Sequence, residues 1–147
     1  MTNSPCNSCG RYQTRSVTVD AMVVNEIGQI LLIKRKNQPY RNHWALPGGY
    51  LDQDETTAQG ALRELKEETG LSADNAEFLG FYDDPSRDPK QNVSFVYMVS
   101  QFTGTPKAGD DAKQTKFFGL GSLPDNIAFD HRSIIADFSL RLVGERL

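Results

Sequence analysis

Residues 49–71 read GYLDQDETTAQGALRELKEETGL, and they are the most informative part of the 147-residue chain. Thr56 and Gln59 have the spacing of a capping box, which predicts a helix that begins near Thr57. Gly70 suits the left-handed position that follows a helix, so the helix is expected to end there. One face of the predicted helix is apolar and should pack on a sheet; its residues are Ala58, Ala61, Leu62 and Leu65.

The opposite face of this helix is acidic. Glu64 is three and four residues before Glu67 and Glu68, so the three carboxylates share a face away from the apolar stripe. Like charges at this spacing repel one another, and a bound cation would remove the repulsion. Arg63 lies four residues before Glu67 and is expected to hold it by a charge-assisted hydrogen bond.

An isolated E-x-x-E-E pattern is usually a solvated helix face, but the pattern here is longer. It reads Gly, five residues, Glu, seven residues, Arg-Glu, an aliphatic residue, any residue, Glu-Glu, any residue, Gly and an aliphatic residue. The matching positions are Gly49, Glu55, Arg63, Glu64, Leu65, Glu67, Glu68, Gly70 and Leu71. A chance match has a probability of about 10⁻⁹ per window. The chain therefore resembles the Nudix hydrolases, and the WALPGG sequence at residues 44–49 is also typical of them.

The resemblance implies a fold and a chemistry. The implied fold class is α/β, the Nudix fold, an α/β/α sandwich around a mixed, curved β-sheet. The implied reaction is hydrolysis of a nucleoside diphosphate linked to another group, with Mg²⁺ as cofactor and Mn²⁺ as an alternative. Clustered carboxylates suit such hard cations, which polarise a phosphate and acidify a water molecule.

The resemblance also implies a set of metal ligands. Glu64 and Glu68 are the expected direct ligands, and Glu67 is expected to hold a second ion directly or through water. The backbone carbonyl of Gly48 is the expected additional ligand, because a glycine permits close approach.

Two further residues of the pattern have expected supporting roles. Arg63 is placed with the three glutamates in the catalytic set, where it orients rather than reacts. Glu55 is expected to shape the loop or the helix start, or to hold an outer-shell water. The general base stays open between Glu64 and an acid at residues 110–111.

Shorter stretches suggest a substrate. Residues 80–89, 108–112 and 128–131 are similar to small, single-domain ADP-ribose pyrophosphatases. This similarity implies that ADP-ribose is cleaved to AMP and ribose 5-phosphate. Other Nudix substrates stay open, namely an oxidised nucleoside triphosphate, a dinucleoside polyphosphate, NADH or a nucleotide sugar. A non-catalytic sensor of ADP-ribose and a structural module stay open as well.

Six residues outside the helix are candidate substrate contacts: Arg35, Tyr82, Arg87, Asp110, Asp111 and His131. Arg35 is expected near the phosphates. Arg87 either contacts the diphosphate or a ribose, or forms a loop ion pair with Asp88. The two aspartates either supply a base or a metal ligand, or form an ordinary turn. Tyr82 either stacks on adenine or packs in the core, and His131 either faces the cleft or bonds locally.

The other elements follow from pattern. Strands are predicted at 16–24, 29–34, 77–82, 93–101 and 115–118, with a turn at 25–28 between the first two. Residues 35–42 are expected to form a loop over the site. Asp130 is the predicted cap of a last helix, whose apolar residues include Ile134, Ile135, Phe138 and Leu142.

Composition agrees with one ordinary domain and a small-molecule partner. The chain is 38% hydrophobic and 24% charged, with a net charge of −3 and a pI near 5.3. A net negative charge does not indicate binding to nucleic acid or to a membrane surface. No apolar run or signal-like segment is evident, so a cytoplasmic protein is expected. The expected partner is a nucleotide-type substrate, and the resemblance allows a homodimer.

Residues 1–15 are expected to be a flexible tail, and residues 16–147 the Nudix domain. The tail carries a C-x-x-C pair, Cys6 and Cys9, the only cysteines in the sequence. A thioredoxin-type motif would need a strand–helix context that the polar tail lacks. The pair could instead be half of a metal knuckle that another part of the chain or a second subunit completes, because a structural zinc site needs four ligands.

Overall fold

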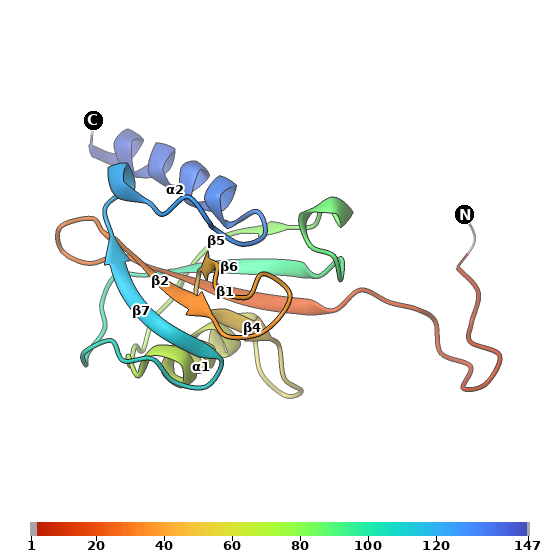
Figure 1. Ribbon diagram of the computed structural model, residues 1–147. Coiled ribbons are helices and arrows are strands. Elements are labelled where there is room, and N and C mark those ends of the chain that lie inside the picture. Colours follow the sequence, from red (N-terminus) through yellow and green to blue (C-terminus); the bar gives the residue numbers. More distant parts are fainter. Residues whose placement is uncertain (1–2, 147) are drawn as a thin grey trace.

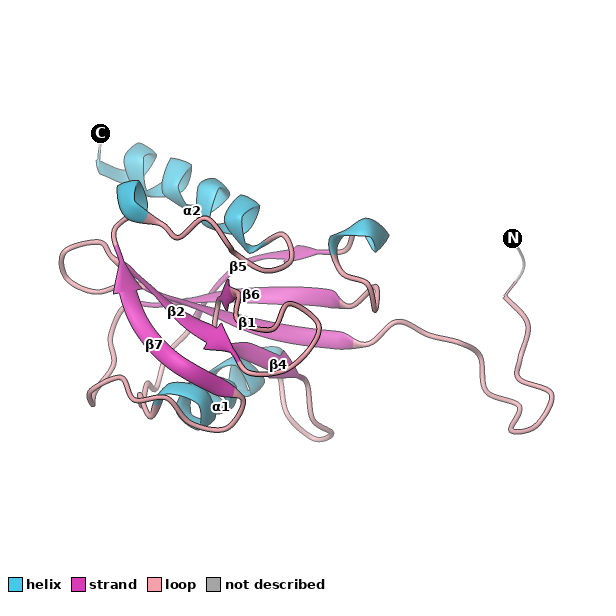
Figure 2. Cartoon of the chain, viewed as in Figure 1, coloured by secondary structure: helices cyan, strands magenta, loops and turns pink. Residues whose placement is uncertain are grey.

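The computed structural model describes residues 3–146, with side chains to Leu140, and it contains two sheets between two helices (Figures 1 and 2). In chain order the elements are β1 (Val17–Val23), β2 (Ile30–Arg35), β3 (Trp44–Ala45), β4 (Gly48–Tyr50), α1 (Thr57–Thr69), β5 (Glu77–Tyr82), the 3-10 turn η1 (Pro85–Arg87), β6 (Val93–Val99), β7 (Ala112–Phe118), the 3-10 turn η2 (Leu120–Ser122) and α2 (His131–Arg146). The predicted α/β sandwich is confirmed. No helix among the described residues is long and apolar enough to cross a membrane.

The strands pair in two separate sheets rather than one. The larger sheet has the order β4-β1-β6-β5, in which β1 and β6 are parallel and the other pairs antiparallel. The smaller sheet has the order β3-β2-β7 and is antiparallel. The mixed sheet expected from the sequence is the larger one.

A tight turn carries the chain from one sheet to the other. Gly28 has a positive φ of 79°, and its N–H donates to the carbonyl of Asn25 at 3.0 Å. The Asn25 side chain accepts the N–H of Gln29 at 2.8 Å. The predicted turn at 25–28 is therefore confirmed, and it sets β1 and β2 on adjacent sheets.

Alternating residues of the strands build a core on each face. On one face, α1 covers a cluster that contains Ala21, Val23, Leu31, Leu65, Leu71 and Val99. On the other face, α2 covers a cluster that contains Met22, Val24, Ile30, Leu32, Leu46, Val96, Ile134, Ile135 and Phe138. Each cluster includes residues of both sheets, so burial of apolar surface holds the two sheets together.

Helix α1 has the predicted ends. The Thr56 hydroxyl accepts the N–H of Gln59 at 3.1 Å, and the Gln59 side chain accepts the N–H of Thr56 at 2.8 Å. Gly70 is left-handed, with φ 77°, and its N–H donates to the carbonyl of Lys66 at 2.9 Å. The acidic residues of this helix therefore stand on a segment with both ends fixed.

The later elements agree with the predicted pattern except at their ends. Strand β6 stops at Val99, and β7 begins at Ala112 rather than at Thr115, because its first residues pair with Lys34 and Arg35. Helix α2 begins at His131, after the predicted cap residue. The side chain of Leu142 lies outside the described residues. Residues 1 and 2 of the predicted tail and residue 147 of the predicted domain lie outside them as well. Residues 3–15 extend away from the body of the molecule (Figure 1).

Candidate active site

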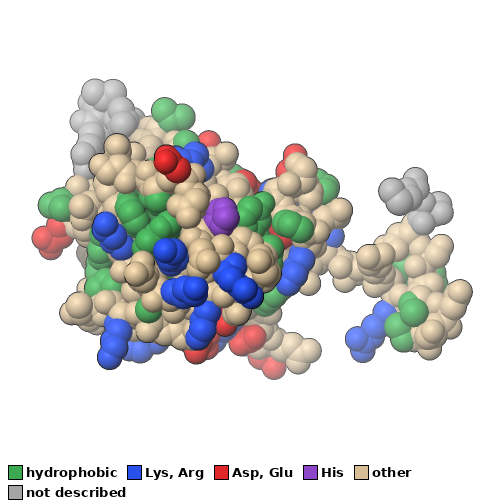
Figure 3. All heavy atoms as spheres, in the orientation of Figure 1, with side chains coloured by type: hydrophobic (Ala, Val, Ile, Leu, Met, Phe, Trp, Pro, Cys, Tyr) green, Lys and Arg blue, Asp and Glu red, His purple; other side chains and the backbone are tan. Residues whose placement is uncertain are grey.

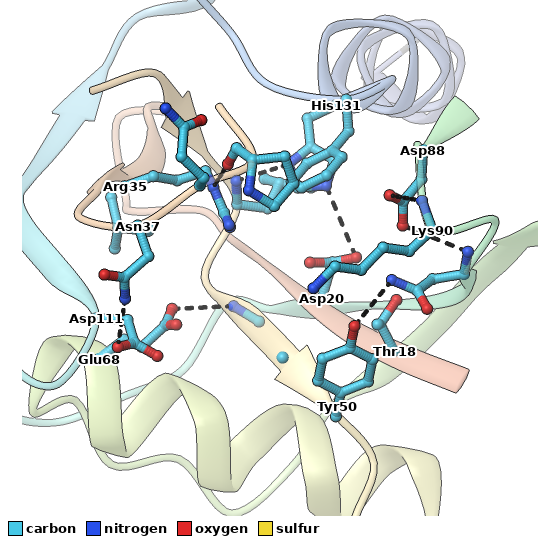
Figure 4. Close-up of a pocket in the computed structure, with 18 of the residues that line it drawn as sticks. Thr18, Asp20, Arg35, Asn37, Tyr50, Glu68, Asp88, Lys90, Asp111 and His131 are labelled. Carbon is cyan, nitrogen blue, oxygen red and sulfur yellow. Dashed lines mark hydrogen bonds and ion pairs between the residues drawn. The ribbon is translucent and has the colours of Figure 1, made fainter. Parts of the chain in front are cut away.

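A cavity of about 290 Å³ opens between the C-terminal end of α1 and the smaller sheet (Figure 4). Its walls come from β1, β2, β4, α1, the loop after β2, the loop before β6 and the start of α2. Of the loop predicted at residues 35–42, residues 36–39 line the cavity, and Arg35, which also lines it, is the last residue of β2. The cavity is thus lined by side chains that are far apart in the sequence.

Glu68 is the acid that α1 contributes to this cavity. Its side chain is buried, with a relative exposure of 6%, and its Oε2 accepts the N–H of Gly48 at 3.0 Å. Burial raises the pKa of Glu68 well above the ordinary value, and the nearby carboxylates of Glu64, Asp20 and Asp111 raise it further. A cation beside these groups would offset both effects.

Arg63 holds the other acids of the pattern. Its guanidinium donates to Glu55 at 2.8 and 3.0 Å, to Glu64 at 2.9 Å and to Glu67 at 3.1 Å. It also donates to the carbonyl of Tyr50 at 3.0 Å. The predicted Arg63–Glu67 hydrogen bond is therefore present, and the same guanidinium orients two more carboxylates.

Glu55 shapes the loop before the helix. Its carboxylate accepts the N–H of Asp52 at 2.8 Å in addition to the Arg63 bonds. The hydrogen bond from Arg63 is the main cause that lowers the pKa of Glu55. The loop-shaping role is the one of its predicted roles that these contacts support.

Two glycines allow strand β4 to lie close to β1 and α1. A Cβ on Gly49 would come within 2.5 Å of Glu64 Oε1. A Cβ on Gly48 would come within 2.2 Å of the Val19 carbonyl and of Asp20 Oδ1. The absence of these side chains places the β4 backbone against the acidic face of α1.

The donor set fits a hard divalent cation in its chemistry. Glu64, Glu67 and Glu68 offer carboxylate oxygens, and burial is the first cause that raises the pKa of Glu64. The carboxylates of Glu64 and Glu67 are held by Arg63, and no group of three or more metal-binding side chains lies together among the described residues. The assignment of Glu64, Glu67, Glu68 and the Gly48 carbonyl as ligands stays a prediction.

The other walls of the cavity carry cations as well as acids. Arg35 and Lys90 point into the cavity from different elements (Figure 4), and Lys36 also lines it. Arg35 donates to the carbonyl of Pro39 at 2.8 Å, and its guanidinium lies 5.0 Å from the centre of the Phe129 ring. Lys and Arg side chains also gather on the outer face over the smaller sheet (Figure 3). Asp20, Asp88 and Asp111 line the cavity as well, so acidic and basic side chains face each other across it.

His131, at the start of α2, lines the cavity and is buried. Its Nδ1 accepts the N–H of Leu46 at 3.0 Å, and its Nε2 lies 3.8 Å from Asp20 Oδ2. The Ser94 hydroxyl donates to the same Asp20 oxygen. Burial lowers the pKa of His131, although the Asp20 charge opposes this. His131 therefore lines the cavity and also holds the backbone two residues before Gly48.

Arg87 pairs with Asp130 rather than with its neighbour. It donates to the Asp130 carboxylate at 2.7 and 2.9 Å and to the Asn92 carbonyl at 3.0 Å. Asp88 instead accepts the N–H groups of Lys90 and Asn92 at 2.9 and 3.3 Å. The ion pair considered for residues 87 and 88 is thus replaced by a bidentate pair between buried Arg87 of η1 and partly buried Asp130, which precedes α2.

Two of the predicted substrate contacts lie elsewhere. The Tyr82 hydroxyl bonds to Asp137 at 2.9 Å, in a groove beside α2. Asp110 has a positive φ of 47° and belongs to a turn outside the cavity lining. Its neighbour Asp111 does line the cavity and accepts the Asn37 amide at 2.9 Å.

Sequence reasoning missed several lining residues, among them Asp20, Tyr50, Lys90 and Phe129. Asp20 had a usable signal, because it is the one acid in an otherwise largely apolar strand. The other three stand in loops or at a strand end, where no periodicity marks them.

Comparison with known proteins gives consistent matches. The model of the NUDIX domain family matches residues 14–138. The chain is 45% identical over 128 residues to an ADP-ribose pyrophosphatase of Methanocaldococcus jannaschii, covering 86% of this chain and 75% of the relative. It is 35% identical over 120 residues to a putative 8-oxo-dGTP diphosphatase of Bacillus subtilis, covering 80% and 75%.

Solved structures are similar as well. A MutT/nudix family protein from Enterococcus faecalis superposes with a TM-score of 0.82 and 34% identity, over 91% of this chain and 64% of that one. A bifunctional NMN adenylyltransferase/ADP ribose pyrophosphatase from Francisella tularensis, complexed with AMP and a manganese ion, gives 0.76 and 36%, over 88% and 42%. The NUDIX domain of Shewanella oneidensis NrtR, complexed with ADP ribose, gives 0.79 and 28%, over 88% and 90%.

Proposed function

The chain belongs to the Nudix family, and on that premise we propose that it hydrolyses the diphosphate of ADP-ribose to AMP and ribose 5-phosphate with Mg²⁺ or Mn²⁺. The observation that carries the proposal is that one cavity holds carboxylates and cations together. Buried Glu68 lines it, and so do Arg35, Lys36 and Lys90. A diphosphate with its metal ion needs both kinds of side chain, because the ion requires anionic ligands and the phosphate oxygens require cations.

The metal site would be formed by Glu64, Glu67, Glu68 and the Gly48 carbonyl. A divalent ion bound there supplies charge neutralisation at the phosphate and acidifies a water molecule. The protein's own contribution is to hold the carboxylates in place. Arg63 does so for Glu64 and Glu67, and the Gly48 N–H does so for Glu68.

The cations that line the cavity would bind the diphosphate. Arg35 is already held by the Pro39 carbonyl and the Phe129 ring, so little side-chain freedom is lost when a ligand binds. Lys90 lies on another wall, next to Asp88, which fixes its backbone. Two cations on separate walls suit an extended anion that spans the cavity.

The choice of ADP-ribose rests on the named relatives. The Methanocaldococcus and Francisella proteins carry this activity in their names, and the Shewanella domain was crystallised with ADP ribose. An 8-oxo-dGTP diphosphatase is the second candidate, since the Bacillus relative covers a similar share of the chain.

The test is a substrate panel with each metal ion. The panel contains ADP-ribose, 8-oxo-dGTP, a dinucleoside polyphosphate, NADH and a nucleotide sugar, and the products are identified by chromatography and mass spectrometry. Preferential conversion of ADP-ribose to AMP and ribose 5-phosphate is expected. Preference for another nucleotide would contradict the substrate assignment, and tight ADP-ribose binding without turnover of any compound would contradict the enzymatic one.

A further inference from the structure

The N-terminal segment forms a hairpin that the proposed reaction does not use. The Cys6 N–H donates to the Arg11 carbonyl at 2.7 Å, and the Gly10 N–H donates to the Cys6 carbonyl at 2.8 Å. Gly10 is left-handed, with φ 71°, and Pro5 bridges to Tyr12 across the hairpin. The two cysteines are therefore held on one tight backbone turn.

The turn brings the two thiols together and exposes them. Cys6 and Cys9 are both free and exposed. The Cys6 sulfur accepts hydrogen bonds from the backbone of Ser8 and Cys9 and from the Cys9 thiol, and these bonds lower the pKa of Cys6. Backbone N–H groups that point at a sulfur favour its thiolate form, which is the form that binds metals.

The hairpin is held at a distance from the rest of the molecule. Arg15, at its base, donates to the carbonyls of Gln91 and Asp83 at 2.6 and 2.7 Å. Beyond this anchor the segment projects away from the sheets and helices (Figure 1). The thiols are thus accessible to another molecule.

Among the residues that the structure describes, no group of three or more His, Cys, Asp or Glu side chains lies together at this pair. Residues 3–15 contain no histidine, aspartate or glutamate. His131 is buried in the body, where its Nδ1 is already bonded to Leu46. Zinc with two thiolates needs two more ligands to complete a structural site.

We propose that Cys6 and Cys9 form half of a tetrathiolate zinc site, which the same pair of a second copy of this chain completes. A two-fold axis through the metal would give each copy the same role, as in most homodimers. Four thiolates around Zn²⁺ carry a net charge of −2, and Arg11 on each hairpin supplies positive charge beside them. This proposal does not depend on the reaction proposed above.

The experiment measures zinc content and mass of the full chain under reducing conditions. Zinc is added to the purified protein, unbound metal is removed, and light scattering after size exclusion gives the mass. We expect about 0.5 zinc per chain in a dimer, and a monomer after treatment with EDTA. Replacement of zinc by Co²⁺ should give the strong visible absorption of a tetrahedral thiolate complex.

Two variants make the result specific. The double substitution Cys6→Ser with Cys9→Ser should abolish zinc binding and leave a monomer with an unchanged circular dichroism spectrum. Asn7→Ala, in the same turn, should keep both zinc and dimer. A monomer with one zinc per chain, a reduced chain without zinc, or a dimer that survives both EDTA and the double substitution would each overturn the proposal.

Discussion

The N–H of Gly48 donates to Glu68 Oε2 at 3.0 Å, across 20 residues of sequence, and this bond joins β4 to the last turn of α1. It gives a buried carboxylate one fixed partner and leaves its other oxygen for a ligand. Because burial and the neighbouring acids both disfavour the charge on Glu68, this residue is the most direct point at which to test the site.

Glu68→Gln is expected to lower turnover of ADP-ribose by at least about 100-fold, because an amide is a poor replacement for an anionic metal ligand. The measurement is the initial rate at saturating Mg²⁺, alongside a circular dichroism spectrum that should be unchanged. Glu77→Gln, which neutralises an exposed glutamate on β5, is the matched control and should retain the wild-type rate. A wild-type rate in Glu68→Gln would rule out the ligand role.

The metal-free protein should lose stability as the pH rises because of Glu68. Its folded pKa is raised above the unfolded value, so the folded state binds the proton more tightly. The stability that protonated Glu68 contributes is fully present below its unfolded pKa of about 4.5. It is lost as the pH rises through the folded pKa. Urea unfolding in EDTA should show a shallower decline for Glu68→Gln, and Mg²⁺ should stabilise only the wild type. Equal pH slopes for the two proteins would contradict this.

The adjacent glycines should respond differently to alanine. Gly48→Ala places a methyl group against the Val19 backbone, which cannot yield, so a loss of about 1–3 kcal/mol in unfolding free energy is expected. Gly49→Ala meets only the end of the Glu64 side chain, so stability should change little while activity falls about tenfold or more. Thermal melts and rates distinguish the two, and Gly121→Ala, with open space around it, is the control. Equal melting temperatures for Gly48→Ala and Gly49→Ala would refute the geometry.

Substitution of only one partner of the Arg87–Asp130 pair should lower the free energy of unfolding strongly. Asp130→Ala leaves a buried guanidinium without its carboxylate, and a loss of about 3–5 kcal/mol is expected. Arg87→Leu combined with Asp130→Ala removes both charges and should recover part of that loss. Chemical denaturation of the two single variants and the double variant gives the coupling. If the double variant lost more stability than the sum of the single losses, the pair would not be acting as proposed.

His131 should add a second pH dependence of opposite sign. Its folded pKa is lowered by burial, so the neutral ring is favoured in the folded state. The stability that neutral His131 contributes is fully present above its unfolded pKa of about 6.5. It is lost as the pH falls through the folded pKa. His131→Gln should flatten the stability curve on this acid side. An NMR titration that found His131 protonated at neutral pH would disprove the assignment.

The sequence predicted the parts of the molecule that repeat with a regular period. The ends of α1 followed from Thr56, Gln59 and Gly70, because capping is a local property. The Nudix assignment is confirmed by the family match over residues 14–138. The division into two sheets was not foreseen, since strand pairing joins residues that are far apart and no local pattern encodes it.

The same limit applies to the site. Glu64, Glu67 and Glu68 could be found together because one helix carries them. The partner of Arg87 could not, because Asp130 lies 43 residues away and Asp88 is the nearer acid in the sequence. Tyr82 was predicted to contact the substrate because of its place in the sequence after the Nudix pattern. In the structure its hydroxyl instead bonds to Asp137 of α2.

The cavity lies where the two sheets meet, with Glu68 on the helix that covers the larger sheet and Arg35 at the end of a strand in the smaller one. A ligand that touched both would act as a clamp between the two halves of the sandwich. Ligand binding should then slow the exchange of backbone amide hydrogens in the walls of the cavity and also in β6 and β7. Neither of these strands needs to touch the ligand.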